Sequence, residues 1–319
     1  MAGLTLERCV PPFWARTGHA QTIWGHLLRS PRLRVEGERV EVELQDGDRL
    51  VGARFAGGGG RVAYLFHGLG GSSEADYIRR ATAVCLRRGY TVYAINHRGC
   101  GAGVGLARHP YHSGRAEDLA AVIAYGRKLH PRARHAAVGF SLSANMLLLL
   151  LGGQRGSTLP DYAVAFNAPI DLDTCSRALT RPFNRIYDSR FVLRGRRDLV
   201  EKGIHLQYPV PAYSTLREFD RIYIAPASGF RDREEYYDTC SAGKYVDQIQ
   251  VPTAVIHAGD DPIIPVGTYE NARFSSSCLV HIEKVGGHMG YLSARPTPFG
   301  TIRWQDYALN RALAELEKG

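Results

Sequence analysis

Three residues of this 319-residue chain, Ser141, Asp261 and His288, have the side-chain types that nucleophilic catalysis by a serine requires. Serine is a poor nucleophile at its ordinary pKa, so a neutral imidazole must take its proton and a carboxylate must hold the imidazole in the right tautomer. Each of the three follows a short apolar run, and the strands of an open α/β sheet present ligand-binding residues at such ends. We expect Ser141 to be the nucleophile, His288 the general base and Asp261 the carboxylate that orients it.

The serine lies in Gly139-Phe140-Ser141-Leu142-Ser143, between an apolar run and the leucine-rich segment 142–151. A strand, a sharp turn and a helix in this order expose a nucleophilic hydroxyl beside the amino end of the helix. The familiar pattern is Gly-x-Ser-x-Gly, and Ser143 replaces its second glycine. That position mainly needs a small side chain. The pentapeptide alone fits a turn serine, whereas its place in the order Ser141, Asp261, His288 favours catalysis.

Two backbone amides are candidates for stabilising the oxyanion that forms when an ester carbonyl is attacked. One belongs to Leu142, directly after the serine. The other belongs to Leu69 in "HGLGG" (67–71), a glycine-rich loop that follows the apolar run 62–67. Neither this loop nor "HRGCG" (97–101) matches a phosphate-binding fingerprint.

Asp260, which stands next to Asp261, is an alternative candidate for the carboxylate that orients His288. We favour Asp261, which directly precedes Pro262 and comes three residues after the end of the apolar run 253–258. On its own, His288 also fits a surface loop.

The elements that must position these residues follow an α/β pattern. The alternating runs 38–44 and 49–55 flank "QDGD", a hairpin turn signal. Continuous apolar runs at 62–67, 91–96, 135–140, 162–167, 253–258 and 279–284 predict strands buried on both faces. Helices predicted at 76–88, 115–129 and 142–151 connect them by right-handed crossovers. The prediction is a mostly parallel sheet with an amino-terminal antiparallel hairpin and helices on both faces.

This pattern stops between two strands, over about seventy residues. A structureless loop of that length is improbable, so we predict a core formed by 1–170 and 242–319 with a cap inserted at 171–241. The predicted cap is rich in aromatic residues, and we expect some of them to line an acyl pocket while the rest pack the cap. They are Phe183, Tyr187, Phe191, Tyr208, Tyr213, Phe219, Tyr223, Phe230, Tyr236 and Tyr237.

Composition restricts the class of protein. Apolar residues make up 45% and charged residues 22%, which is typical of a folded globular chain. The net charge is +9, and residues 51–170 hold 14 Lys and Arg against 5 Asp and Glu, without a basic run or a stacking pattern. We expect no nucleic-acid partner and assign the excess to solvated helix faces, which leaves a weak attraction to anionic lipid open.

Other features predict a cytoplasmic protein without a metal site. The amino-terminal residues lack the features of a signal peptide, and the run 146–151 is too short to span a bilayer. Six scattered cysteines without a CxxC pair argue against a zinc site and a disulfide scaffold. His109 and His112 have no carboxylate or cysteine partner set nearby in the sequence, so we expect no metal. His257, inside an apolar run, fits a hydrogen-bonded core histidine.

The sequence resembles the YheT-like branch of the α/β-hydrolases, which includes bacterial esterases, eukaryotic medium-chain fatty acid ethyl ester synthase/esterases and phospholipid-cleaving hydrolases. The matching segments span nearly the whole chain. They are "PPFWARTGHAQTIWGHLLR" (11–29), "HGLGGSSEADYIRR" (67–80), "NHRGC" (96–100), "YHSGRAEDL" (111–119), "SLSANMLLLLLG" (141–152), "LREFD" with "GFRDREEYY" (216–237), "DDPIIP" (260–265) and "GGHMGYL" (286–292). The family usually reads Ser-Leu-Gly-Gly-Asn where this chain reads Ser-Leu-Ser-Ala-Asn (141–145).

The resemblance implies an α/β-hydrolase fold and carboxylic ester hydrolysis without metal or organic cofactor, with Ser141, Asp261 and His288 as nucleophile, acid and base. His19 and Gln21 match the family's amino-terminal block, with no role derived for them. We expect a serine carboxylesterase acting on short- to medium-chain acyl esters or lipids. The alternatives are an acyltransferase that uses the same triad and a non-catalytic lipid-binding module. The oligomeric state is not predicted.

Overall fold

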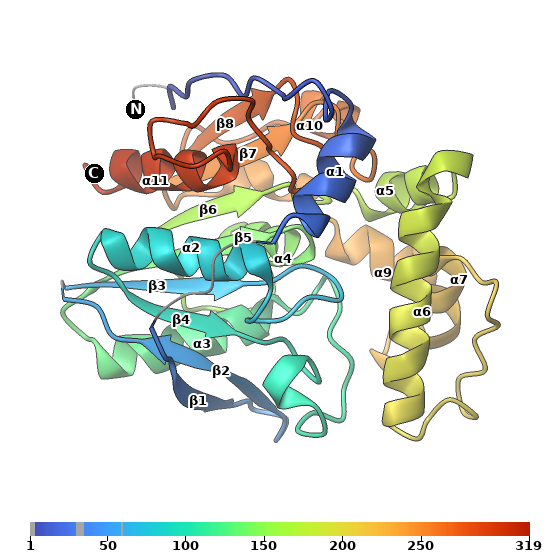
Figure 1. The fold of residues 1–319 in the computed structure, drawn as a ribbon. Coiled ribbons are helices and arrows are strands. Elements are labelled where there is room, and N and C mark those ends of the chain that lie inside the picture. Colours follow the sequence, from blue (N-terminus) through green and yellow to red (C-terminus); the bar gives the residue numbers. More distant parts are fainter. Residues whose placement is uncertain (1–3, 30–34, 59) are drawn as a thin grey trace.

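The computed structural model describes residues 4–29, 35–58 and 60–319, and the strands of this part form one eight-stranded sheet (Figure 1). The order is β1-β2-β4-β3-β5-β6-β7-β8. The strands are β1 (Glu38–Glu43), β2 (Arg49–Phe55), β3 (Arg61–Phe66), β4 (Thr91–Ile95), β5 (Arg134–Phe140), β6 (Tyr162–Phe166), β7 (Thr253–Ala258) and β8 (Cys278–Glu283). β2 pairs antiparallel with β1 and β4, and all other pairs are parallel. The predicted hairpin and mostly parallel sheet are confirmed.

Helices cover both faces of the sheet, as predicted. On one face lie α2 (Asp76–Arg87) and α11 (Trp304–Leu316), and on the other α3 (Ala116–Leu129) and α4 (Leu142–Leu151). Alternate side chains of β3 serve the two cores: Tyr64 and Phe66 pack with α3 and α4, whereas Ala63 and Leu65 pack with α2. Because β4 and β5 lie on opposite sides of β3, the strand order reverses there, which is where open α/β sheets bind ligands.

The expectation of two-sided burial is wrong for β8. This strand ends the sheet, and Val280 and Ile282 are exposed on it. An edge strand with one solvated face can carry apolar residues without a partner layer, and a continuous apolar run does not reveal that.

Among the described α-helices outside 171–241, three were not predicted: α11, α1 (Gly18–Leu27) and the short α10 (Gly267–Glu270). Glycines in α1 lower its helix propensity, but they permit close packing. A Cβ on Gly18 would lie 1.8 Å from the Asp260 carbonyl oxygen, and one on Gly25 would lie 2.5 Å from Gly290 Cα. The packing that stabilises α1 therefore depends on residues far away in sequence.

Between β6 and β7 the chain forms a group of helices beside the sheet (Figure 1). They are α5 (Leu172–Leu179), α6 (Arg185–Glu201), α7 (Leu216–Phe219), α8 (Ala225–Ala227) and α9 (Arg233–Cys240). A further short helix, α10 (Gly267–Glu270), follows β7. We propose that 171–241 is a cap on a core of 1–170 and 242–319.

Within the described residues, no helix is both long enough and apolar enough to cross a lipid bilayer.

Candidate active site

Ser141, His288 and Asp261 form a hydrogen-bonded chain at the carboxyl edge of the sheet. Nδ1 of His288 lies 2.8 Å from Asp261 Oδ2, and Nε2 lies 2.9 Å from Ser141 Oγ. Because a carboxylate only accepts hydrogen bonds, Nδ1 carries the proton, and Nε2 of the neutral ring accepts from the serine hydroxyl. This arrangement lets the imidazole take the serine proton.

Asp261 is buried, and both of its carboxylate oxygens accept hydrogen bonds. Its Oδ1 accepts from the amides of Ile263 (2.8 Å) and Ile264 (3.1 Å), and Asn167 Nδ2 donates to Oδ2 at 2.8 Å. Burial alone would raise the pKa of Asp261, but the charge and hydrogen bond of His288 outweigh it and lower this pKa below its usual value. The carboxyl group therefore stays ionised beside the imidazole.

Asp260, the alternative acid, contacts the backbone of the histidine loop instead of the imidazole. Its Oδ1 accepts from the amides of Gly286 and Gly287, both at 2.8 Å. The two neighbouring carboxylates thus have separate contacts: Asp261 bonds the ring of His288, and Asp260 holds the loop that presents it.

A sharp turn between β5 and α4 presents Ser141. Its φ is 54° and its ψ −119°, a conformation that non-glycine residues rarely adopt and that is typical of a nucleophile elbow. The Ser141 amide donates to the Phe166 carbonyl oxygen of β6 at 2.8 Å. A Cβ on Gly139 would lie 2.7 Å from the Ser143 carbonyl oxygen, so only glycine permits this approach of helix to strand.

The loop after β3 carries the first candidate donor, the amide of Leu69. The amides on either side of Leu69 have side-chain acceptors, because Gly68 N donates to Tyr77 Oη (2.9 Å) and Gly70 N to Tyr111 Oη (2.8 Å). Among the described residues, no hydrogen-bond acceptor faces the amide of Leu69 itself. This amide is free to donate to a bound oxyanion.

Leu142 supplies the second candidate donor. Its amide opens α4, and the first amides of a helix have no intrahelical partner. Leu69, Leu142, Ser141 and His288 all line one cavity of about 150 Å³. The two residues whose amides are candidate donors thus line the same cavity as the serine and the histidine.

The rest of the cavity wall is mostly apolar and comes largely from the helices between β6 and β7. The aromatic residues that line it, among those suspected from the sequence, are Phe191, Phe219, Tyr223, Tyr236 and Tyr237. Asp220 also lines it and accepts from Tyr237 Oη at 2.7 Å, and burial raises the pKa of Asp220 to about 7. Arg194, Asp198 and Lys202 form a charged section of the wall.

Comparisons with known proteins agree with this geometry. Residues 63–299 match the alpha/beta hydrolase family. The putative esterase YheT of Escherichia coli (strain K12) is 30% identical over 294 residues, which cover 86% of this chain and 84% of that protein. The chain belongs to the alpha/beta hydrolase family.

Two further similarities support the same branch and fold. Medium-chain fatty acid ethyl ester synthase/esterase 2 of Saccharomyces cerevisiae is 29% identical over 261 residues, covering 72% of this chain and 58% of that protein. A solved esterase of Pyrococcus furiosus, 19% identical, superposes with a TM-score of 0.61 over 91% of this chain and 97% of its own. The predicted α/β-hydrolase fold and the resemblance to the YheT-like branch are confirmed.

Within this alpha/beta hydrolase, Ser143 has a contact that the sequence did not reveal. It is fully buried, and its hydroxyl donates to the His67 carbonyl oxygen and lies 2.5 Å from His97 Nε2. The His97 amide in turn donates to His67 Nε2 at 3.1 Å. Burial lowers the pKa of His67 to about 4, so its ring is neutral at pH 7 and can accept this bond. Ser143 therefore ties α4 to the loop that carries Leu69.

The amino-terminal block packs on the loop of the hydrolase that presents His288. The His288 amide donates to Thr22 Oγ at 2.8 Å. The buried carboxamide of Gln21 accepts from the Leu292 amide (2.6 Å) and donates to the Leu292 carbonyl oxygen (3.0 Å). His19 stacks on Tyr187 of α6, and its Nδ1 lies 3.0 Å from the hydroxyl oxygen of Tyr187. Gln21 and Thr22 thus hold the histidine loop, and His19 joins α1 to α6.

Sequence reasoning missed Asn167 and Thr22 as parts of the site. Asn167 ends the apolar run 162–167, so it carries the same strand-end signal as Ser141 and could have been found. Besides Asp261, it contacts the hydroxyl of Tyr291, which donates to its Oδ1 at 2.9 Å. Thr22 has no such signal, because its contact depends on the packing of α1.

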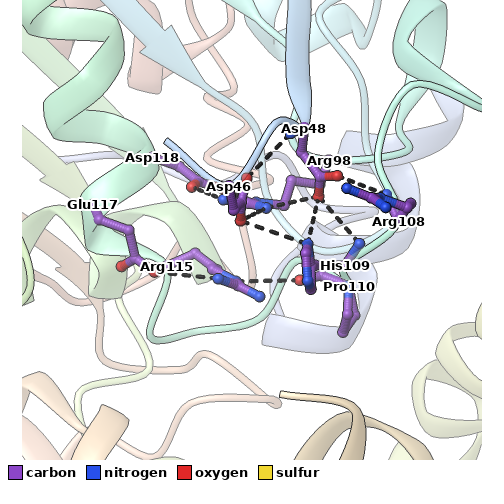
Figure 2. Close-up of polar contacts among 9 residues, drawn as sticks. All are labelled: Asp46, Asp48, Arg98, Arg108, His109, Pro110, Arg115, Glu117 and Asp118. Carbon is purple, nitrogen blue, oxygen red and sulfur yellow. Dashed lines mark hydrogen bonds and ion pairs between the residues drawn. The ribbon is translucent and has the colours of Figure 1, made fainter. Parts of the chain in front are cut away.

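Arg98, Asp48 and Asp118 form the buried part of an ionic cluster that also includes the more exposed Asp46 and His109 (Figure 2). Arg98 also lines the cavity. Nε and Nη2 of Arg98 donate to the Asp118 carboxylate at 2.7 and 2.6 Å. Nη1 donates to Asp46 at 2.6 Å and to Asp48 at 2.7 Å. The cluster joins the turn of the β1–β2 hairpin to the loop after β4 and to the start of α3.

His109 was expected to have no carboxylate partner. This expectation is wrong, because folding brings two carboxylates to it. Its Nδ1 lies 3.0 Å from Asp48 Oδ2. Asp46, Asp48 and His109 could together offer three ligand atoms, but Arg98 already provides a cation to both carboxylates (Figure 2). Burial would raise the pKa of Asp48, yet the amides of Arg108 and His109 and the neighbouring side chains lower it to about 2. These contacts are those of a structural ion cluster.

The expectation that His257 is hydrogen-bonded is also wrong. Its ring is buried and stacks on Tyr269 with centroids 4.1 Å apart, and neither ring nitrogen has a hydrogen-bond partner among the described residues. An aromatic stack replaces the polar contact.

Proposed function

We propose that this alpha/beta hydrolase is a serine carboxylesterase acting on short- to medium-chain acyl esters through an acyl-enzyme intermediate. The observation that carries the proposal is the chain from Ser141 Oγ to His288 Nε2 and from Nδ1 to Asp261 Oδ2. It stands at the end of an apolar cavity, beside two backbone amides available as donors. Relatives named as esterases support ester hydrolysis as the general activity.

The chemistry proceeds in two halves. Ser141 Oγ attacks the ester carbonyl carbon while His288 Nε2 takes the hydroxyl proton, and the amides of Leu69 and Leu142 bind the oxyanion. The tetrahedral intermediate collapses, the C–O bond to the alcohol breaks, and His288 returns the proton to the leaving oxygen. Water then attacks the acyl-enzyme with His288 as base, which releases the acid and restores Ser141. Each buried oxyanion donor typically contributes about 3 kcal/mol to lowering the barrier.

The proposal also includes the class of substrate, the cofactor requirement and the place of action. The substrate is a small-molecule ester or lipid, and the chemistry above needs neither metal nor organic cofactor. A cytoplasmic site of action has support from the six cysteines, all within the described residues and all free.

Initial rates on p-nitrophenyl esters from acetate to palmitate test the proposal. Wild type should show one chain-length optimum, and Ser141→Ala should lose the activity, whereas the matched control Ser189→Ala, at an exposed serine of α6, should keep it. Activity that survives Ser141→Ala would remove Ser141 as nucleophile. Inactivity of wild type on every ester would favour the non-catalytic lipid-binding alternative.

The cavity wall should set the chain-length optimum. Phe191→Ala enlarges the cavity, so we expect the optimum to move to longer acyl chains. Tyr213→Ala removes a ring that is 82% exposed and lies outside the cavity wall, and it should leave the profile unchanged. Equal profiles for wild type and Phe191→Ala would contradict an acyl pocket at this place.

Acyl transfer to an alcohol is the second candidate, favoured by the printed name of the yeast relative, a fatty acid ethyl ester synthase/esterase. In that case an alcohol replaces water in the second half-reaction. Product analysis with added ethanol distinguishes the two: ethyl ester as the main product would make this chain an acyltransferase, and free acid would make it a hydrolase.

A further inference from the structure

An exposed apolar surface lies on α1 and at the start of α6. We define it as the aromatic face. Its members are Phe13, Trp14, Ile23, Trp24, Leu27, Phe183 and Ile186. Phe13 and Phe183 are 81% and 84% exposed. Clustered large apolar side chains on a surface mark an interaction site, whereas scattered ones do not.

The two segments of the aromatic face are neighbours in space. Trp14 and Trp24 meet edge to face with centroids 5.9 Å apart. His19 of α1 stacks on Tyr187 and lies 6.4 Å from the ring of Phe183. Figure 1 shows α1 between the sheet and the helices that follow β6. The two segments therefore adjoin at His19, where α1 meets the start of α6.

The surroundings of the aromatic face are basic. Residues 8–29 contain three arginines and two histidines without an acidic residue. In the second segment, around the start of α6, Arg177 and Arg185 form ion pairs with Asp173 and Asp188, whereas no ion pair of Arg181 is found among the described residues. Arg16 and Arg181 are exposed, the first next to α1 and the second two residues before Phe183. An apolar surface rimmed by cations complements an anionic lipid bilayer.

The opposite side of α1 holds the proposed active site. Thr22 accepts from the His288 amide, and Gln21 binds Leu292 through both ends of its carboxamide. Leu179, which lines the cavity, lies two residues before Arg181. A partner bound to the aromatic face would therefore lie beside the cavity.

We propose that the aromatic face docks this protein onto the surface of a bilayer that contains anionic phospholipid. The rings of Trp14 and Trp24 lie at the level of the lipid headgroups, Phe13 and Phe183 enter the acyl boundary, and Arg16 and Arg181 pair with phosphate groups. Docking of this kind needs no spanning helix. The proposal rests on the proposed ester hydrolysis for its purpose, because it would deliver lipid esters to the cavity.

Tryptophan fluorescence of the protein can report docking. It has three tryptophans, of which Trp14 and Trp24 belong to the aromatic face, while Trp304 is 1% exposed. Vesicles of phosphatidylcholine mixed with phosphatidylglycerol should shift the tryptophan emission to shorter wavelength, and pure phosphatidylcholine vesicles should shift it much less. Brominated acyl chains in the mixed vesicles should quench it. An unchanged spectrum with mixed vesicles would overturn the proposal.

Variants on the surface locate the contact. Cosedimentation with the mixed vesicles should weaken about tenfold or more in Phe13→Ser/Phe183→Ser and in Arg16→Glu/Arg181→Glu. Leu206→Ser/Tyr213→Ser is the matched apolar control, because these side chains are 84% and 82% exposed on another part of the chain between β6 and β7. Arg132→Glu, at an exposed arginine before β5, is the charge control. Equal losses in the variants and their controls would overturn the proposal.

Two measurements separate the remaining explanations. If wild type is a dimer by light scattering and Phe13→Ser/Phe183→Ser is a monomer, the aromatic face is a protein interface and the proposal is wrong. Ser141→Ala should bind the mixed vesicles as wild type does. Vesicle binding without hydrolysis of any soluble ester would contradict the proposed function and leave the docking surface in place, whereas ester hydrolysis without vesicle binding would contradict the docking surface alone.

Discussion

Around Asp261 and His288, backbone amides and one carboxamide hold charged or ionisable groups, whereas around Leu69 the phenols of Tyr77 and Tyr111 hold a neutral loop. In the proposed mechanism, the acid–base residues depend on the single charge of Asp261. The proposed oxyanion loop depends on several side-chain hydroxyls, and we expect the removal of one of them to shift the loop only slightly. Substitutions should therefore act nearly all-or-none at the acid–base residues and by degrees around the proposed oxyanion loop.

The largest effect is expected from Asp261→Asn. The amide would favour the wrong imidazole tautomer, so kcat should fall about 10⁴-fold, as in other serine triads. Asp260→Asn is the matched control: its Oδ1 can still accept from the amides of Gly286 and Gly287, so kcat should fall less than about tenfold. Steady-state rates on one p-nitrophenyl ester compare the two. A larger loss in Asp260→Asn would exchange their roles.

Tyr111→Phe should have an intermediate effect. It leaves the Gly70 amide without its acceptor and so displaces the neighbouring Leu69 amide. We expect kcat to fall about 10- to 100-fold with KM nearly unchanged, because the oxyanion exists only after attack. The affinity for a trifluoromethyl ketone inhibitor, which forms an oxyanion on the serine, should fall by the same factor.

Tyr125→Phe, on α3, is the control for this substitution. If Tyr111→Phe raised KM and left kcat and inhibitor affinity intact, Tyr111 would contact substrate and would not position the Leu69 amide.

Ser143→Ala should have a smaller effect. It removes the hydroxyl that ties α4 to His67, but His97 Nε2 still lies 3.1 Å from the same carbonyl oxygen. We expect kcat to fall up to about tenfold, and Ser143→Thr to restore part of the loss if its hydroxyl adopts the same rotamer. A kcat loss as large as that of Asp261→Asn would contradict the expectation that substitutions around the proposed oxyanion loop reduce kcat only by degrees.

His257→Phe should change stability and its pH dependence more than catalysis. Burial lowers the pKa of His257 to about 4, against about 6.5 in the unfolded chain. Between these values the unfolded chain binds the extra proton, so wild type loses about 2 kcal/mol of unfolding free energy from this group as the pH falls from 7 to 5. The variant should lack this loss. Urea unfolding of both proteins at pH 7 and 5 measures it, and identical pH dependence would contradict a buried neutral ring.

Much of the fold follows from local patterns. β2 coincides with the alternating run 49–55, β7 with the continuous apolar run 253–258, and the helix after Ser141 with the leucine-rich segment 142–151. Alternation is typical of a strand with one buried face, and continuous apolar residues are typical of a parallel strand buried on both faces. The helix α1 could not be predicted in this way, since its glycines fit contacts with Asp260 and Gly290 that only the folded chain contains. The exposure of β8 likewise depends on its place at the sheet edge.

The residues of the candidate site also divide into those that local patterns predict and those that only the folded chain brings together. Residues after strand ends could be selected from the sequence, and the structure brings Ser141, Asp261 and His288 into contact. The partners of Ser143 and the carboxylates beside His109 come from distant segments, and no local pattern predicts such contacts.

Covalent labelling tests the central claim most directly. A fluorophosphonate reacts with an activated serine, which displaces fluoride and retains the phosphonyl group. Peptide mapping by mass spectrometry should find this group on Ser141, in step with the loss of esterase activity, and in Asp261→Asn the labelling should slow strongly. Complete inactivation with the label on another residue, or full activity after Ser141 is labelled, would contradict the account.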